Sequence, residues 1–187
     1  MVETLVVATV AITAAAAVVP VTLNTIANFR INGDAHAIGN HLAHAKMRAA
    51  ANFTLSRLYV DLNANSYHTE VWRKSGTPGW ITEGGVETLA RGDAFSLGGV
   101  TAPPASTQVT LAQAPPCSDD LGNTINNTAC VVFNSRGIPI DATGAATASD
   151  ALYITGAGGV YGTTLSATAR VQLWWTAGGN AGWMRKQ

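Results

Sequence analysis

Residues 2–23 read VETLVVATVAITAAAAVVPVTL, and this stretch decides the class of protein. It is almost wholly apolar or small and carries a single charge, at Glu3. About 20 helical residues cross the hydrocarbon core of a bilayer, so the length suits a membrane span. The many Ala and Thr residues would also let neighbouring helices approach closely. We therefore expect a helix that can lie in lipid or pack against other helices.

Three other interpretations of this stretch compete. A secretory signal peptide has a basic region before its apolar core, but no Lys or Arg precedes Arg30. A simple membrane anchor usually has basic residues on its cytoplasmic flank, and none is visible. A buried helix of a soluble enzyme can be this apolar, but rarely begins at the chain terminus. The distinguishing feature is Glu3, because a carboxylate at the edge of hydrocarbon is costly unless it is paired.

The block Met1-Val2-Glu3-Thr4-Leu5, with 17 residues from Glu3 to Pro20, resembles the start of type IV pilins and of type II secretion pseudopilins. The cleavage-site glycine and the first aromatic residue of that family have no counterpart here. The resemblance implies that Glu3 pairs with the amino terminus of a neighbouring subunit during assembly, and that the N-terminus is methylated. A plain helix cap, where the helix dipole favours an anion, is the alternative role for Glu3. Pro20 lacks an amide hydrogen, so it should kink or loosen the helix.

Beyond Pro20 the helical pattern becomes amphipathic. One face is formed by apolar residues at spacings of three and four, namely Ile31, Ala35, Ile38, Leu42, Ala45 and Ala49. We therefore predict one helix over residues 2–51. Its part within residues 1–23 forms the transmembrane or filament-core half, and residues 24–51 form the amphipathic half.

Residues 52–187 are expected to form a β-rich globular domain, which makes the whole chain α+β with a type IV pilin-like fold: one long N-terminal helix packed on a mainly antiparallel sheet domain. Short β-prone runs separated by turn residues occur at residues 55–62, 67–73, 80–82, 108–111, 131–133, 151–155 and 168–175. Residues 130–139 and 169–175 resemble the turn block and the closing strand of GspH/FimT-type minor pilins. An ordinary hairpin around Asn134 and Gly137 is the competing interpretation of the first of these blocks.

The two cysteines, Cys117 and Cys130, match neither a CxxC redox motif nor a zinc site. One disulfide closing a loop of 14 residues is favoured, and it would stabilise the fold by about 3 kcal/mol. Two free thiols in a cytosolic protein are the alternative. A disulfide places the domain in an oxidising compartment.

Composition and motifs argue against catalysis. Lys and Arg number 11, Asp and Glu number 11, and only 12% of residues are charged, so the chain has no bulk attraction for nucleic acid or acidic membranes. His36, His41 and His44 lie close together in the sequence, but no HExxH pattern occurs. Nucleophile-elbow and phosphate-loop motifs are also missing. We expect a non-enzyme with no catalytic, metal or cofactor site.

The resemblance implies a structural subunit of a type IV pilus or a type II secretion pseudopilus. Such a subunit sits in the bacterial inner membrane, in contact with lipid and the assembly machinery, and then joins copies of itself or other pilins in a periplasmic or extracellular filament. The alternative is a minor pilin that binds DNA or a surface, with Arg185, Lys186 and Trp183 near the C-terminus as contacts. A membrane-anchored adhesin that never polymerises is a third possibility.

Overall fold

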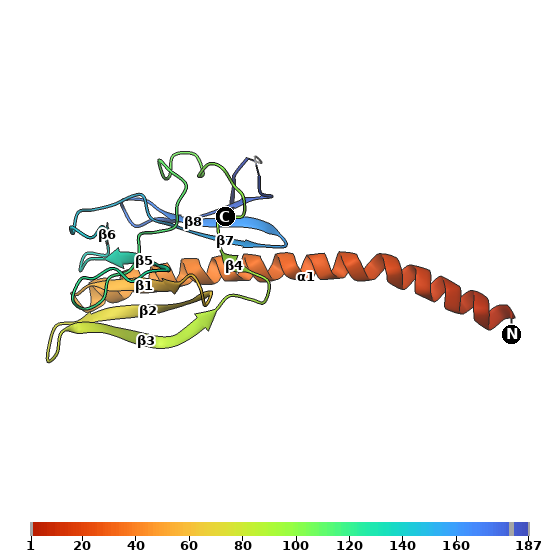
Figure 1. The fold of residues 1–187 in the computed structure, drawn as a ribbon, viewed down its shortest axis with the longest axis horizontal. Helices are drawn as coiled ribbons and strands as arrows, with labels where there is room; N and C mark the ends of the chain where they lie inside the picture. The colour runs from red at the N-terminus through yellow and green to blue at the C-terminus, as the bar shows by residue number, and fades with distance from the viewer. Residues whose placement is uncertain (1, 180–181, 187) are drawn as a thin grey trace.

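The computed structural model describes residues 2–179 and 182–186; within the long helix, side chains are described at Ala16, Thr22 and from Thr25 onward. Helix α1 spans Val2–Ala51 without a break. At a rise of 1.5 Å per residue, its 50 residues extend for roughly 75 Å. Figure 1 shows that the domain packs around the second half of α1, whereas the first half projects away from it and curves. The α+β architecture predicted from the sequence is present.

The buried face of α1 is the predicted one. All six of its apolar residues are 0% exposed, and they are Ile31, Ala35, Ile38, Leu42, Ala45 and Ala49. Their spacing of three and four residues keeps them on one side of a helix with 3.6 residues per turn. Three of the six are alanines, so the backbone of the helix lies close to the sheets.

The domain contains two antiparallel sheets of five strands each. The first sheet has the order β3-β2-β1-β5-β6, with β1 Ser56–Asp61, β2 Ser66–Arg73, β3 Gly79–Thr88, β5 Thr128–Phe133 and β6 Pro139–Ile140. The second has the order β10-β9-β8-β7-β4, with β4 Ala94–Phe95, β7 Ala151–Gly156, β8 Gly159–Leu165, β9 Val171–Thr176 and β10 Met184–Lys186.

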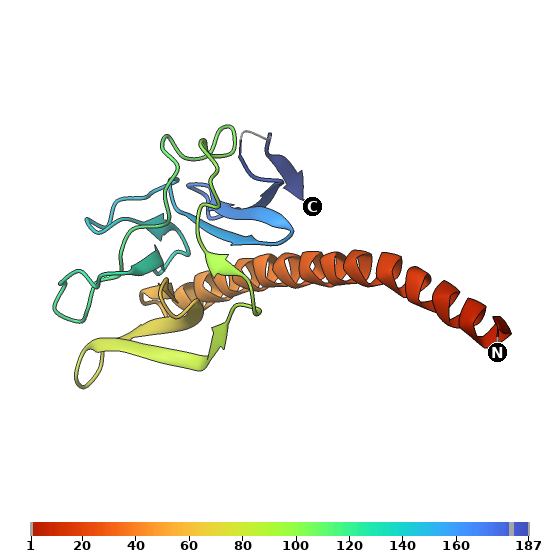
Figure 2. The same cartoon turned by 45° about the vertical axis from the view of Figure 1, so that its right-hand side comes forward.

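Helix α1 is covered by both sheets. It contacts β1, β2 and β5 of the first sheet and β7, β8 and β9 of the second. Figure 2 shows the two sheets on different sides of the helix. The chain crosses from the first sheet to the second between β3 and β4, and Asp34 of α1 accepts a hydrogen bond from the amide of Ala90 in this crossover, at 2.8 Å. The helix is therefore the element around which a single core forms.

Most of the predicted strands are present, but the strand predicted at residues 108–111 is not, and strand β8 lies outside the predicted runs. Residues 108–111 are not a strand, because Gln108 is held by side-chain hydrogen bonds to the carbonyls of Ala112 and Ser149 instead of by a ladder. Strand β8 was missed, because Gly162 interrupts its apolar pattern. That glycine is needed where β8 passes Tyr153: a Cβ there would lie 2.7 Å from Cε1 of the ring.

The predicted tight turn after β5 is confirmed. The amide of Gly137 donates a hydrogen bond to the carbonyl of Asn134 at 2.8 Å. Gly137 has a φ of 71°, a conformation that glycine adopts without steric cost. The side chain of Asn134 accepts a further bond from the amide of Arg136 at 2.9 Å.

Candidate assembly surface and cationic groove

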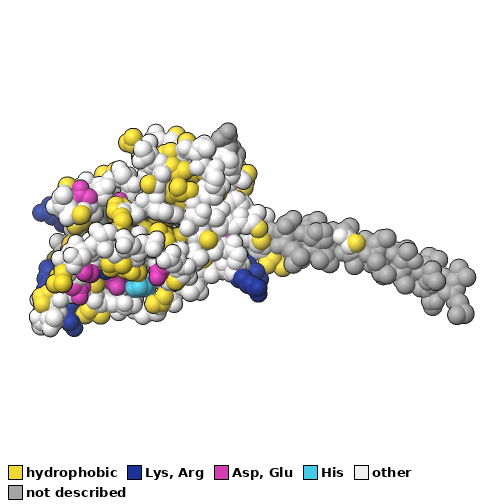
Figure 3. All heavy atoms as spheres, in the orientation of Figure 1, with side chains coloured by type: hydrophobic (Ala, Val, Ile, Leu, Met, Phe, Trp, Pro, Cys, Tyr) yellow, Lys and Arg dark blue, Asp and Glu magenta, His cyan; other side chains and the backbone are white. Residues whose placement is uncertain are grey.

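The face of α1 that points away from the core is exposed and almost free of charge. We call this the outer face and define it by residues that recur at spacings of three and four, namely Ile26, Phe29, Gly33, His36, Asn40, Ala43 and Met47. Three of its hydrophobic side chains are exposed by 41%, 69% and 60%, at Ile26, Phe29 and Met47. Hydrophobic and basic side chains are visible where α1 emerges from the domain (Figure 3). A helix with one face in its own core and a second, uncharged face in solvent is suited to packing against another helix.

The two residues assigned to the first half of α1 lie outside the described side chains. Nothing in the structure tests the assembly role of Glu3 or the kink at Pro20, although the helical backbone continues through both positions. Among the residues whose side chains are described, no helix combines the length and apolar character needed to cross a membrane. The segment of residues 2–23 lies almost entirely outside that set.

A groove of about 400 Å³ separates α1 from the end of the second sheet. His36 and Asn40 line it from the helix, and Arg170, Arg185 and Lys186 line it from the sheet. None of its lining residues is acidic. We call it the cationic groove, and its charge favours an anionic partner.

A second groove of about 380 Å³ adjoins the first and shares His36 and Lys186 with it. It adds the exposed ring of Phe29 and the ring of Tyr161 to the lining. The ammonium of Lys186 also lies 5.0 Å from the ring centroid of Trp175, so its position is partly set by a cation–π contact. The two grooves together continue along α1 toward the point where the helix leaves the domain.

The three C-terminal residues named from the sequence are separated by the fold. Arg185 and Lys186 line the cationic groove, but Trp183 does not. Its indole Nε1 donates to the carbonyl of Ala102 at 2.8 Å, and its ring lies 5.8 Å from that of Tyr153. Sequence reasoning missed Arg170, which the pairing of β9 with β10 brings beside the C-terminus and which no local motif marks.

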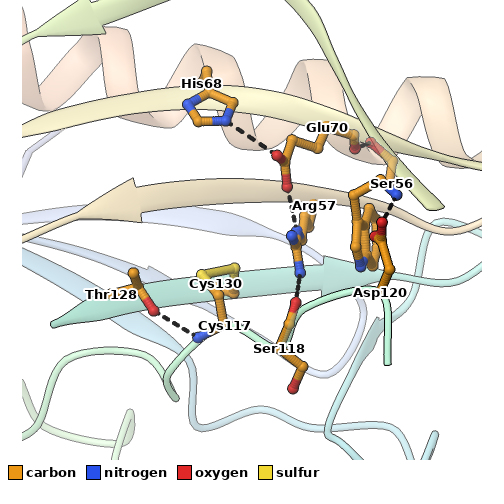
Figure 4. A network of polar contacts seen from close by, with 10 residues as sticks. Ser56, Arg57, His68, Glu70, Cys117, Ser118, Asp120, Thr128 and Cys130 are labelled. Carbon is orange, nitrogen blue, oxygen red and sulfur yellow. Dashed lines mark hydrogen bonds and ion pairs between the residues drawn. A yellow bond between two sulfur atoms is a disulfide. The ribbon is translucent and has the colours of Figure 1, made fainter. Parts of the chain in front are cut away.

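A buried charged network connects the outer side of the first sheet to the disulfide loop (Figure 4). Arg57, 3% exposed, donates from Nε to Oε2 of Glu70 at 2.5 Å and from Nη1 to the carbonyl of Ser118 at 2.7 Å. His68 Nε2 lies 3.2 Å from Oε1 of Glu70. The guanidinium also stacks 3.9 Å from the ring centroid of Trp80. The network thereby joins β1, β2 and β3 to the loop that follows Cys117.

Opposing effects set the ionisation of this network. Burial alone would raise the pKa of Glu70, but the hydrogen bond from His68 and the charge of Arg57 outweigh it and lower the pKa. Burial lowers the pKa of Arg57, against the stabilising charge of Glu70. Arg57 and Glu70 are therefore both charged at neutral pH. They serve as hydrogen-bonding partners for each other inside the fold and not as reactive groups.

Cys117 and Cys130 form the disulfide that the sequence favours. The amide of Cys117 also donates to the hydroxyl of Thr128 at 2.9 Å, on the strand that carries Cys130. The loop between the cysteines is therefore tied to β5 by a covalent bond and by a hydrogen bond.

The clustered histidines of α1 have separate environments. His41 Nε2 lies 3.1 Å from Oε1 of Glu87, and its Nδ1 lies 3.3 Å from the hydroxyl of Thr69. His36 and His44 are exposed. In the described part of the chain, no three potential ligands are grouped as a metal ion would need.

Comparison with solved structures finds a likeness in fold. No protein-family model and no curated protein matches this chain. The chain is similar to the minor pseudopilin EpsH from the type II secretion system of Vibrio cholerae, whose crystal structure is known. The TM-score is 0.45 and the identity 12%, over 83% of this chain and 95% of that one.

Proposed function

We propose that this chain is a structural subunit of a pilus or pseudopilus, held in a membrane by the first half of α1 before it polymerises. The observation that carries the proposal is the 50-residue helix, whose second half is buried by the domain and whose apolar first half projects beyond it. A projecting apolar helix needs lipid or other helices around it. The exposed outer face continues this contact surface along the second half of α1, and its residues His36 and Asn40 also border the cationic groove.

The physical basis is an exchange of one apolar environment for another. Burial in lipid is replaced by burial among neighbouring helices, so the free-energy change of extraction is small and an assembly motor can drive it. Residues 1–23 would supply the membrane and filament core, residues 24–51 the bridge to the domain, and residues 52–187 the surface. The subunit would pass from the bacterial inner membrane into a periplasmic or extracellular filament of itself or of other pilins.

Glu3 is the residue that sets the axial position of each subunit in this proposal. A buried carboxylate without a partner costs about 3–5 kcal/mol, so the helix would stop where Glu3 meets the amino terminus of its neighbour. Glu3→Ala should leave expression and membrane insertion intact and abolish filament incorporation. Electron cryo-microscopy of sheared fibres measures this, with Glu83→Ala in the domain as the control for loss of an acid. Normal fibres from Glu3→Ala would refute the assigned role.

A second candidate function is DNA binding by the cationic groove, supported by Arg170, Arg185 and Lys186 along a surface without acidic residues. Phosphate contacts of this kind release counterions, so the affinity would fall steeply as salt rises.

The test is the double variant Arg185→Ala with Lys186→Ala, measured by fluorescence anisotropy with labelled duplex DNA. The matched control is Arg73→Ala with Lys74→Ala, another adjacent pair of exposed cations, on the β2–β3 hairpin. Loss of binding in the first variant only would support the function. Equal effects of the two variants, or no salt dependence, would remove it.

A further inference from the structure

A small cavity lies beneath the disulfide loop, apart from α1 and the cationic groove. Its volume is about 100 Å³. Its walls include the disulfide, Pro115, Pro116 and Ile140, and its charged lining residues are Arg57, Asp141 and Asp150. The cavity is therefore mostly apolar, with charges at particular positions.

Asp150 is the unusual residue in this lining. It is 4% exposed, yet no described residue forms a hydrogen bond or an ion pair with its carboxylate. Burial, followed by the nearby charge of Asp141, raises the pKa of Asp150 to about 6. The carboxylate is thus mostly ionised at neutral pH. Its oxygens are not fully enclosed, since among the described residues only Oδ2 of Asp93 is a fully buried side-chain oxygen without a hydrogen bond, so a ligand in the cavity can reach them.

The other charges of the cavity do not neutralise Asp150. Arg57 is the only cation in the lining, and its guanidinium is held by Glu70 and by the carbonyl of Ser118. Asp141 has the same sign as Asp150. Its Oδ1 accepts hydrogen bonds from the amides of Thr143 and Ala145 and from the hydroxyl of Thr143, and the residue is exposed to solvent.

We propose that this cavity binds a primary alkylammonium group, with Asp150 as the counter-ion, Asp141 as a second acceptor, and Pro115, Pro116 and Ile140 around the alkyl stem. An ammonium carries three N–H donors on a compact charge, and two carboxylates suffice to accept them. A calcium ion needs six to eight oxygen ligands, and walls of Pro, Ile and Val do not supply them. The group is either a free amine or the side chain of a lysine in a partner protein.

The test uses the full chain in detergent micelles and n-butylammonium as the probe, with n-butanol as the uncharged control of the same stem. Isothermal titration calorimetry should detect n-butylammonium and not n-butanol. Asp150→Asn should weaken binding by about tenfold or more, which corresponds to the loss of one ion pair. Asp61→Asn, which changes an acid on the opposite end of β1, should leave binding unchanged.

The pH dependence gives an independent readout. The probe remains protonated up to pH 9, so affinity should follow the ionisation of Asp150, whose pKa is about 6. Binding should be about tenfold weaker at pH 5 than at pH 7.5 and should level off above that. Ala142→Leu, which places a larger side chain in the lining, should also remove binding while it leaves Asp150 intact.

Three results would overturn the site. The first is equal binding of n-butanol and n-butylammonium, which would make the cavity merely apolar. The second is no heat from n-butylammonium at tens of millimolar. The third is full binding of n-butylammonium by a folded Asp150→Asn variant. An acetylated peptide with one lysine, compared with its norleucine counterpart, then distinguishes the sources: tighter binding than n-butylammonium indicates a partner protein, and weaker binding indicates a free amine.

Discussion

At the scale of single residues, the first sheet holds a buried ion pair between Arg57 and Glu70. Arg57 and Glu70 are both buried. The attraction and hydrogen bonding between them offset the hydration that each charge loses on burial. Replacing such a pair by apolar residues often leaves stability unchanged. Removing one partner, however, leaves the other as a buried charge without a counter-ion. The network is therefore sensitive to single substitutions.

Glu70→Ala should lower the free energy of unfolding by about 3–5 kcal/mol, because Arg57 is left buried without its counter-ion. The matched control is Glu83→Ala, which removes a partly exposed ion pair with Arg48 and should cost less than about 1 kcal/mol. Urea denaturation followed by tryptophan fluorescence measures both. Equal losses of unfolding free energy in the two variants would show that removing a partner from the buried pair costs no more than removing one from the exposed pair.

Asp93 contributes stability to the folded domain at acidic pH that is lost at neutral pH. Burial, and then a hydrogen bond and charge repulsion from Asp34, raise the pKa of Asp93 to about 6, despite the opposing charge of Arg30. The raised pKa means that the folded state binds a proton more tightly than the unfolded state. This stabilisation is complete below about pH 3.8 and is lost as pH rises through 6.

Asp93→Asn should therefore flatten the fall in melting temperature between pH 4 and pH 7. Thermal unfolding followed by circular dichroism across this range measures the slope. Asp150 contributes a slope of the same sign, so Asp93→Asn should remove only part of it, and addition of Asp150→Asn should remove more. An unchanged slope in both variants would contradict the assigned pKa values.

At the scale of elements, α1 has two functions on two faces. The buried face holds the sheets together, and the outer face is free for contact. Leu42 is 0% exposed and Met47 is 60% exposed, although they are only five positions apart.

Leu42→Ala should destabilise the domain by about 2–5 kcal/mol, because it leaves a cavity between the helix and the sheets. Met47→Ala should change the free energy of unfolding by less than about 0.5 kcal/mol. Chemical denaturation measures both, and fibre yield measures assembly. Reduced fibre yield from Met47→Ala with unchanged stability is expected if the outer face packs against neighbours, and unchanged yield would remove that residue from the contact surface.

The elements also differ in how far the sequence predicts them. The helix is predicted well, because a period of 3.6 residues repeats over many turns and needs no partner to be recognised. Strand β3 extends to Thr88, well beyond the predicted residues 80–82, because its exposed residues show no apolar alternation. Strands β4, β6 and β10 have two or three residues each, and they exist only because a neighbouring strand pairs with them.

At the scale of the whole molecule, the arrangement is a rod with a domain at one end. Such a shape separates the part that assembles from the part that faces outward. If residues 2–23 serve only as an anchor, any membrane span of equal length should replace them. If they form a filament core, their own sequence is needed.

Replacing residues 2–23 by an unrelated transmembrane helix should keep the domain folded and membrane-bound but abolish filaments. Protease protection and membrane fractionation measure the first outcome, and electron microscopy with cysteine crosslinking between N-terminal helices measures the second. If filaments still form after the exchange, residues 2–23 act as a membrane anchor that any span can replace. If the protein keeps its full biological function without any filament, it is a membrane-anchored adhesin that does not polymerise.

The sequence by itself determined the long helix, its buried face and the β-rich nature of the rest, because each depends on local periodicity, and it favoured the disulfide over two free thiols. Only the tertiary structure decided that there are two sheets, that Arg57 is paired with Glu70, that Arg170 joins Arg185 and Lys186 along one groove while Trp183 turns away, and that Asp150 is buried without a partner. These features depend on contacts between residues far apart in the chain, and a sequence pattern carries no record of which distant strand will pair with which. The charge environment of a side chain is set by those pairings, so it becomes readable only after the chain has folded.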